Sequence, residues 1–173
     1  LDALQLADAD QFNKQQSDNQ TNEKIYTIKQ VSTNPMTDHN AWQTLPVMQI
    51  QREGSSEKAE VKLAYDAQNL YVQFQVQDTS PWKNAGKDYT RLFKTGDCVE
   101  LYLSANEQSQ HTDPVVGDQR IVIAPYQDQP VAVLMQVQPF GPIKGQSVTY
   151  RTNWSRTLGN VALLNDARVK VSK

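Results

Sequence analysis

The sequence is poor in the residues on which many enzymes and disulfide-stabilised proteins depend. Its 173 residues contain one cysteine and two histidines. A single cysteine cannot form an internal disulfide, and Cys98 lies in an alternating segment that is typical of a packed thiol rather than a nucleophile. His39 and His111 fall in expected loops, and neither has the Ser/His/Asp or Cys/His spacing of a catalytic site. The sequence therefore gives no positive indication of catalysis.

Long apolar runs and a strong charge of either sign are also missing. No stretch approaches the roughly 20 apolar residues that span a bilayer. The formal net charge of -2 does not favour a nucleic acid or an anionic membrane as the partner. The first residues show neither an initiator Met nor a signal-peptide pattern, so we expect the chain to be a processed part of a larger polypeptide.

What the sequence does contain is a series of short segments with the alternation of β-strands. In 70–77 the apolar residues Leu, Val, Phe and Val alternate with Tyr and Gln, and 99–103 repeats this pattern. We expect the apolar positions of these two strands, from Leu70 to Val76 and from Val99 to Leu103, to share one buried core. Further strands are expected at 24–29, 47–51, 59–65, 120–124, 131–137, 147–151, 160–164 and 168–171.

This pattern predicts an all-β fold. About ten short strands separated by turns, without a convincing amphipathic helix, indicate an antiparallel β-sandwich. A length of 173 residues is sufficient for one such domain. Residues 1–30 read as an upstream segment and linker, since 1–24 are mostly polar and lack a period, and the domain is expected to span 31–173.

Several phrases of this domain resemble the family 9 carbohydrate-binding modules, within the wider set of DOMON-like β-sandwiches. In chain order these phrases are Asp38–Trp42, Leu45–Pro46, Leu63–Asp66, Asn69–Val72, Asp78, Gly96–Leu101 and Gly117–Arg120. The resemblance implies a β-sandwich of jelly-roll or immunoglobulin-like architecture, with Trp42 as a core anchor. It also implies that further strands follow the segment 167–173, so we expect the domain to be truncated at its C-terminal end.

The function implied by the resemblance is non-catalytic binding of a polysaccharide or oligosaccharide within a larger extracellular, periplasmic or cell-surface protein. Sugar rings stack on aromatic faces while polar side chains bond to their hydroxyls. In the best-known modules of the family a sugar end lies between two loop tryptophans, so Trp82 and Trp154 are the candidate clamp for a neutral sugar. The expected polar contacts are Asp78, Asn84, Lys87, Asp88 and Arg91. In the alternative interpretation, each tryptophan packs as a lid on the end of the sandwich.

Two other functions and a metal remain as alternatives. The chain is either a structural or interaction domain without a sugar site, or a haem-binding electron-transfer domain like some DOMON-like relatives. The candidate haem ligands are Met48, Met135, His39 and His111, although Met135 lies on the apolar face of its strand and reads as core. A structural calcium ion is a further alternative, but the aspartates form no EF-hand type run and have ordinary turn and capping positions.

Overall fold

The computed structural model describes residues 26–51, 53–105, 114–139, 141–151 and 155–165. Within these ranges almost all regular structure is β-strand, with two short 3-10 helices. The predicted all-β class is confirmed, and the strands form two largely antiparallel sheets, as expected of a β-sandwich. No helix in the described part of the chain is long and apolar enough to cross a membrane.

The chain divides into two compact units, residues 1–77 and 78–173. The first contains β1 (Lys29–Gln30), η1 (His39–Trp42), β2 (Met48–Gln51), β3 (Lys58–Tyr65) and β4 (Leu70–Gln77). The second contains η2 (Tyr89–Lys94), β5 (Val99–Ser104), β6 (Asp118–Tyr126), β7 (Gln129–Gln136), β8 (Gln146–Arg151) and β9 (Ser155–Leu163). The prediction of a single domain over 31–173 stays a prediction.

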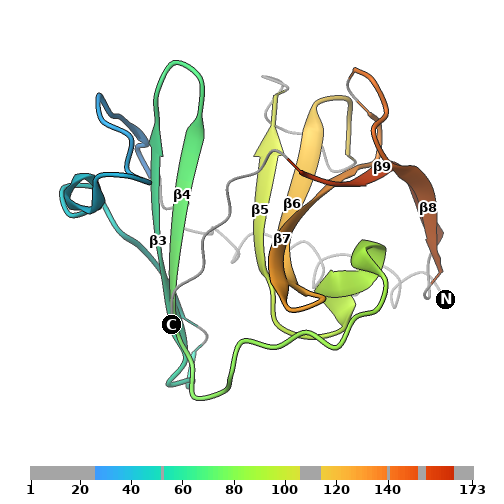
Figure 1. Cartoon of the computed structure of the whole chain (residues 1–173), viewed down its shortest axis with the longest axis horizontal. Coiled ribbons are helices and arrows are strands. Elements are labelled where there is room, and N and C mark those ends of the chain that lie inside the picture. The colour runs from blue at the N-terminus through green and yellow to red at the C-terminus, as the bar shows by residue number, and fades with distance from the viewer. Residues whose placement is uncertain (1–25, 52, 106–113, 140, 152–154, 166–173) are drawn as a thin grey trace, which may run out of the picture. The chain divides into compact units, whose positions relative to one another are not determined.

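In the first unit, β3 is the central strand (Figure 1). It pairs in antiparallel fashion with β4 and β2, and in parallel with β1. The β3–β4 hairpin turns at Asp66, where one carboxylate oxygen accepts the backbone N–H groups of Gln68 and Asn69, at 2.7 and 2.8 Å. The other oxygen accepts the hydroxyl of Tyr71 at 2.6 Å. The turn is therefore held by side-chain bonds that an Asp at this position can make.

Trp42 is buried in this unit, as the family resemblance implied. It packs in a cluster with Leu45, Ala64 and Tyr71 on one face of the sheet. Its indole Nε1 donates to the carbonyl oxygen of Pro35 at 2.9 Å, which satisfies the polar end of the ring. Trp42 is thus a packing residue.

The expected core of β4 is partly wrong. Leu70 and Val76 are 40% and 54% exposed, whereas Val72 and Phe74 between them are half-buried. Both exposed residues lie near the ends of the strand, and the cross-strand partner of Leu70, Tyr65, is itself 42% exposed. The most buried residue of β4 is Tyr71, which the alternation placed on the opposite face and which packs in the cluster with Trp42. The alternation therefore located the strand but did not predict that its other face also carries a buried side chain.

In the second unit, five strands form an antiparallel sheet in the order β5-β6-β7-β9-β8. Gln127 and Asp128 both have positive φ, 51° and 62°, which fits the two-residue turn that joins β6 to β7. The core side chains lie on one face of this sheet, together with a residue from η2: Leu92, Val122, Ala124, Val133, Met135 and Val161. Figure 1 shows the sheet strongly curved, with the green segment that contains η2 inside the curve.

The loop between β4 and β5 contains η2, which the sequence did not predict. Asp88 caps this helix, because its side chain accepts the backbone N–H of Thr90 at 2.9 Å. Leu92, in the helix, is fully buried and joins the core of the sheet. The strand expected at 24–29 overlaps β1 at Lys29 alone, and 168–171 lies outside the described residues. Each of the other predicted strands is observed with its ends within five residues of the expected bounds.

Candidate functional site

A cleft of about 670 Å³ opens on the face of the five-stranded sheet that also carries the core. Its size is within the range of about 300–1,000 Å³ that is typical of sites for small ligands. It is lined by Phe93, Lys94, Tyr102, Leu103, Ser104, Pro114, Asp118, Gln119, Arg120, Met135, Val137, Tyr150, Arg156 and Leu158. All of these belong to the second unit, and they come from η2, from the five strands and from the loops beside them.

The apolar part of the cleft is made by buried side chains of separate elements. Met135 of β7 and Tyr150 of β8 are both buried. The rings of Phe93 and Tyr150 meet edge to face, with their centroids 5.4 Å apart. The hydroxyl of Tyr150 donates to the carbonyl oxygen of Thr90 at 2.6 Å, and the burial of this group raises its pKa. These contacts attach η2 to the sheet and give the cleft a firm apolar wall.

Arg120, which lines the cleft, forms an ion pair with a residue of the neighbouring strand. Glu100 of β5 and Arg120 of β6 lie on the same face, and the guanidinium donates through Nε to Oε2 at 3.0 Å and through Nη2 to Oε1. Each side chain is 23% exposed. This two-bond geometry matches the planar fork of arginine to the carboxylate and orients both groups.

Arg120 also lies between two aromatic rings. Its guanidinium carbon is 4.4 Å from the ring centroid of Phe93 and 5.5 Å from that of Tyr102. Cations are attracted to aromatic faces at such distances. The three side chains therefore form a continuous layer from η2 across the sheet to β5.

Tyr102 is the most exposed aromatic ring of this layer. It is 68% exposed, and its hydroxyl donates to Oε2 of Glu100 at 3.0 Å. Partial burial and this hydrogen bond raise the pKa of the phenol. A tyrosine held at its polar end, with an exposed ring beside charged groups, has the combination of apolar face and hydrogen-bonding neighbours that sugars require.

The sequence reasoning missed Glu100, Tyr102 and Arg120 as site residues. A signal for two of them was present, because Glu100 and Tyr102 stand on the non-apolar side of an alternating strand. Arg120 lies 20 residues from Glu100 in sequence, and the pairing of β5 with β6 brings the two together.

Cys98 lies beside this ion pair and is half-buried, as expected of a packed thiol. Burial, followed by the charge of Glu100 and a hydrogen bond to it, raises the pKa of the thiol to about 11. The thiol donates to Oε1 of Glu100 across 3.6 Å. Because the thiolate is disfavoured, Cys98 is unsuited to act as a nucleophile at neutral pH.

Asn84, a predicted site residue, forms hydrogen bonds that hold the two ends of the η2 loop together. Its Nδ2 donates to the carbonyl oxygens of Leu92 and Asp97, at 2.8 and 3.2 Å. Its Oδ1 accepts the N–H of Gly86 at 2.9 Å and the hydroxyl of Thr95 at 2.7 Å. Every hydrogen-bonding group of the amide thus has a partner within the chain.

The two predicted aspartates have turn and capping roles. Asp78 accepts the backbone N–H and the hydroxyl of Ser80, at 2.7 and 2.9 Å, and these bonds lower the pKa of its carboxyl. Asp88 caps η2 and lies 3.7 Å from Nε of Arg91, with both side chains 52% exposed. An ion pair this exposed contributes little to stability.

The remaining predicted residues stand in or near the same loop. Arg91 holds its guanidinium carbon 5.9 Å from the ring centroid of Tyr150. Lys87 is exposed, and its carbonyl oxygen accepts the hydroxyl of Tyr126 at 3.3 Å. Trp82 is half-buried, while Trp154 lies outside the described residues, so the tryptophan clamp stays a prediction. None of the predicted sugar-binding residues that the structure describes lines the cleft.

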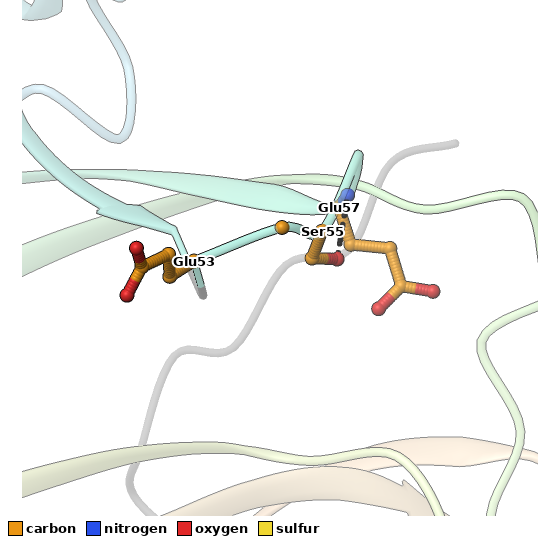
Figure 2. A pocket seen from close by; sticks show the side chains of 4 residues that line it. Glu53, Ser55 and Glu57 are labelled. Atoms are coloured by element: carbon orange, nitrogen blue, oxygen red, sulfur yellow. Dashed lines mark hydrogen bonds between the residues drawn. The ribbon is translucent and has the colours of Figure 1, made fainter.

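A second depression, of about 400 Å³, lies at the turn between β2 and β3. Its lining is Glu53, Gly54, Ser55 and Glu57, and Ser55 Oγ accepts the N–H of Glu57 at 3.0 Å. Figure 2 shows the carboxylates of Glu53 and Glu57 pointing to opposite sides of the turn. In the part of the chain that the structure describes, no group of three or more His, Cys, Asp or Glu side chains is placed to hold a metal ion. This turn therefore lacks the convergent groups of a site.

Comparison with protein-family models gives a match for residues 34–115, to the family described as carbohydrate family 9 binding domain-like. The matched range includes β2 to β5 and η2, and hence Phe93, Lys94, Glu100 and Tyr102 of the site. It confirms the resemblance to family 9 carbohydrate-binding modules over this part of the chain. Searches of curated proteins and of solved structures each found no match.

Proposed function

We propose that this chain is a non-catalytic carbohydrate-binding module and that the cleft of the five-stranded sheet is its saccharide site. The observation that carries the proposal is the exposed ring of Tyr102 next to the Glu100–Arg120 ion pair. The family match over 34–115 supports binding of a carbohydrate rather than catalysis.

Each part of the cleft has a role suited to a sugar. The face of Tyr102 packs against the C–H groups of a pyranose, which gain from burial against an aromatic ring. Glu100 and Arg120 are fixed by their mutual bonds, and a guanidinium that uses only two N–H groups for Glu100 has others for hydroxyls. Because these groups are held before a ligand arrives, little conformational entropy is lost on binding.

The setting of the module forms the second part of the proposal. Accessory binding domains keep an attached catalytic or structural partner close to a polysaccharide, which raises its effective concentration at the surface. We therefore place this module within a larger secreted, periplasmic or cell-surface protein. The full-length sequence checks this part directly, because a neighbouring catalytic domain would identify the polysaccharide.

A glycan array followed by calorimetric titration of the best ligand tests the function. Tyr102→Ala should weaken binding about tenfold, because an aromatic contact contributes roughly 0.5–1.5 kcal/mol beyond area burial and the buried area is also lost. The melting temperature should stay close to that of the parent, since the side chain is largely exposed. Tyr65→Ala is the matched control, as Tyr65 is an exposed tyrosine of the other unit.

Three outcomes would contradict the proposal. Unchanged affinity in Tyr102→Ala would move the sugar site away from the cleft. Absence of any glycan signal would favour a structural or interaction domain. A Soret absorption band in the purified protein would favour the haem-binding alternative.

A further inference from the structure

The cleft carries more positive charge than the chain as a whole. Acidic residues outnumber basic ones in the full sequence, 19 to 17. Among the lining side chains, however, Lys94, Arg120 and Arg156 are cationic and Asp118 alone is a carboxylate. The cations still outnumber the carboxylates when Glu100, the partner of Arg120, is included. This concentration of positive charge is a local feature of the cleft.

The ammonium of Lys94 faces two aromatic rings. It lies 5.4 Å from the ring centroid of Phe93 and 5.7 Å from that of Tyr150. Among the residues that the structure describes, no carboxylate forms an ion pair with it. The two rings attract the cation but do not neutralise it. A positive charge is thus held over the aromatic wall of the cleft.

The surroundings strengthen the field of this ammonium. A wall of low polarity focuses the field of nearby charges into a cleft, because water is displaced from one side. Arg91 adds a second cation at the ring of Tyr150, and its ion pair with Asp88 is exposed and therefore only weakly compensating. Lys94 and Arg91 belong to η2, whereas Tyr102 belongs to β5.

We infer that the ligand of this cleft is an anionic saccharide, in which a sugar ring rests on Tyr102 while a carboxylate or sulfate group faces Lys94. This inference rests on the proposed carbohydrate function and specifies its ligand class. A hydroxyl group of a neutral sugar can accept a hydrogen bond from the ammonium of Lys94, but only an anionic group compensates its charge. A highly charged polyanion such as a nucleic acid is disfavoured by the net negative charge of the chain.

Titration of the whole chain with paired oligosaccharides tests the inference. The probes are uronic-acid oligosaccharides and sulfated oligosaccharides, each compared with the same oligosaccharide after carboxyl reduction or desulfation. We expect an anionic form to bind at least tenfold more tightly than its neutral counterpart, with an advantage that decreases as salt is raised. Loss of binding on carboxyl reduction identifies the carboxylate, and loss on desulfation identifies the sulfate.

A substitution of Lys94 tests whether this residue causes the preference for the anionic ligand. Lys94→Gln should weaken binding of the anionic ligand about tenfold, as for the loss of one charged hydrogen bond, and leave binding of the neutral counterpart unchanged. Lys144→Gln is the matched control, since Lys144 is an exposed lysine of the same unit that does not line the cleft. An equal effect of Lys94→Gln on both ligands would overturn the inference.

The failure of this inference differs from the failure of the proposed function. Equal or tighter binding of the neutral oligosaccharides would overturn the anionic specificity and leave the carbohydrate function in place. Absence of binding to every oligosaccharide would overturn both.

Discussion

The guanidinium carbon of Arg120 lies 4.4 Å from the ring centroid of Phe93. This contact joins β6 to η2. The helix ends 26 residues before Arg120 in the sequence, so the contact connects the sheet to a distant segment. The same guanidinium is bonded at two points to Glu100. One side chain therefore links the β4–β5 loop to two adjacent strands, and the polar groups of the cleft are ordered by contacts within the protein.

Trp82 distinguishes the cleft from the tryptophan clamp predicted from the sequence. If the cleft is the sugar site, the Trp82→Ala variant should bind the glycan with unchanged affinity, because Trp82 does not line the cleft. If the clamp is the site, Trp82→Ala and Trp154→Ala should each abolish affinity while Tyr102→Ala leaves it unchanged. Calorimetric titration of the three variants separates the two, with circular dichroism as the check on folding.

The thiol of Cys98 should react slowly with iodoacetamide at neutral pH. Its rate should rise with pH toward a midpoint near the thiol pKa of about 11. Glu100→Gln should lower this pKa, because it removes the carboxylate charge that disfavours the thiolate. The pKa should stay above its ordinary value of 9.0, since burial is the largest cause of the shift and persists. Mass spectrometry gives the rate, and the single cysteine makes the product unambiguous. Rapid alkylation at pH 7 would contradict this account.

Asp66 should make the first unit sensitive to acid. Its pKa is lowered from 3.8 to about 2, chiefly by the hydroxyl of Tyr71 and next by the N–H of Gln68. A lowered pKa in the folded state means that the stabilisation is fully present above pH 4 and is lost as pH falls toward 2. Asp66→Asn should therefore lower the melting temperature at pH 7, by an amount that shrinks between pH 4 and pH 2.

Tyr71→Phe should reproduce part of this effect, because it removes the largest cause of the shift. Asp128→Asn is the control, as an exposed aspartate of a different turn. A constant difference between Asp66→Asn and the parent from pH 7 to pH 2 would show that the carboxylate charge is not responsible.

Asn84→Ala should loosen the loop that carries η2. The substitution removes the amide group that donates hydrogen bonds to the carbonyl oxygens of Leu92 and Asp97. We expect the free energy of unfolding to fall by about 1–3 kcal/mol. Glycan affinity should fall with it, because η2 supplies one wall of the cleft. Urea denaturation and limited proteolysis measure the change in the loop. Unchanged stability with lost affinity would instead support the direct sugar contact that the sequence predicted for Asn84.

The sequence by itself determined the local elements of this protein. The alternation in 70–77 and 99–103 predicted the strands β4 and β5, because successive side chains of a strand point to opposite faces of the sheet. It did not predict that Tyr71 is buried on the other face of β4, or that Val99, Leu101 and Leu103 lie outside the core cluster of the second unit. The turn at Asp66 was also predictable, since its bonds reach only residues two to five positions away. Cys98 was placed correctly as a packed thiol from its alternating segment, and the burial of Trp42 followed from the family resemblance.

Only the tertiary structure decided which strands are neighbours and which side chains meet. The cleft combines Phe93 of η2, Tyr102 of β5, Arg120 of β6 and Tyr150 of β8. Strand order and register depend on contacts between residues distant in sequence, and no local pattern specifies them. The helix η2 was not predicted because its sequence shows no helical period. Six residues of 3-10 helix have too few turns to show a period, and η2 is held by its Asp88 cap, the burial of Leu92 and the carbonyl bond from Asn84.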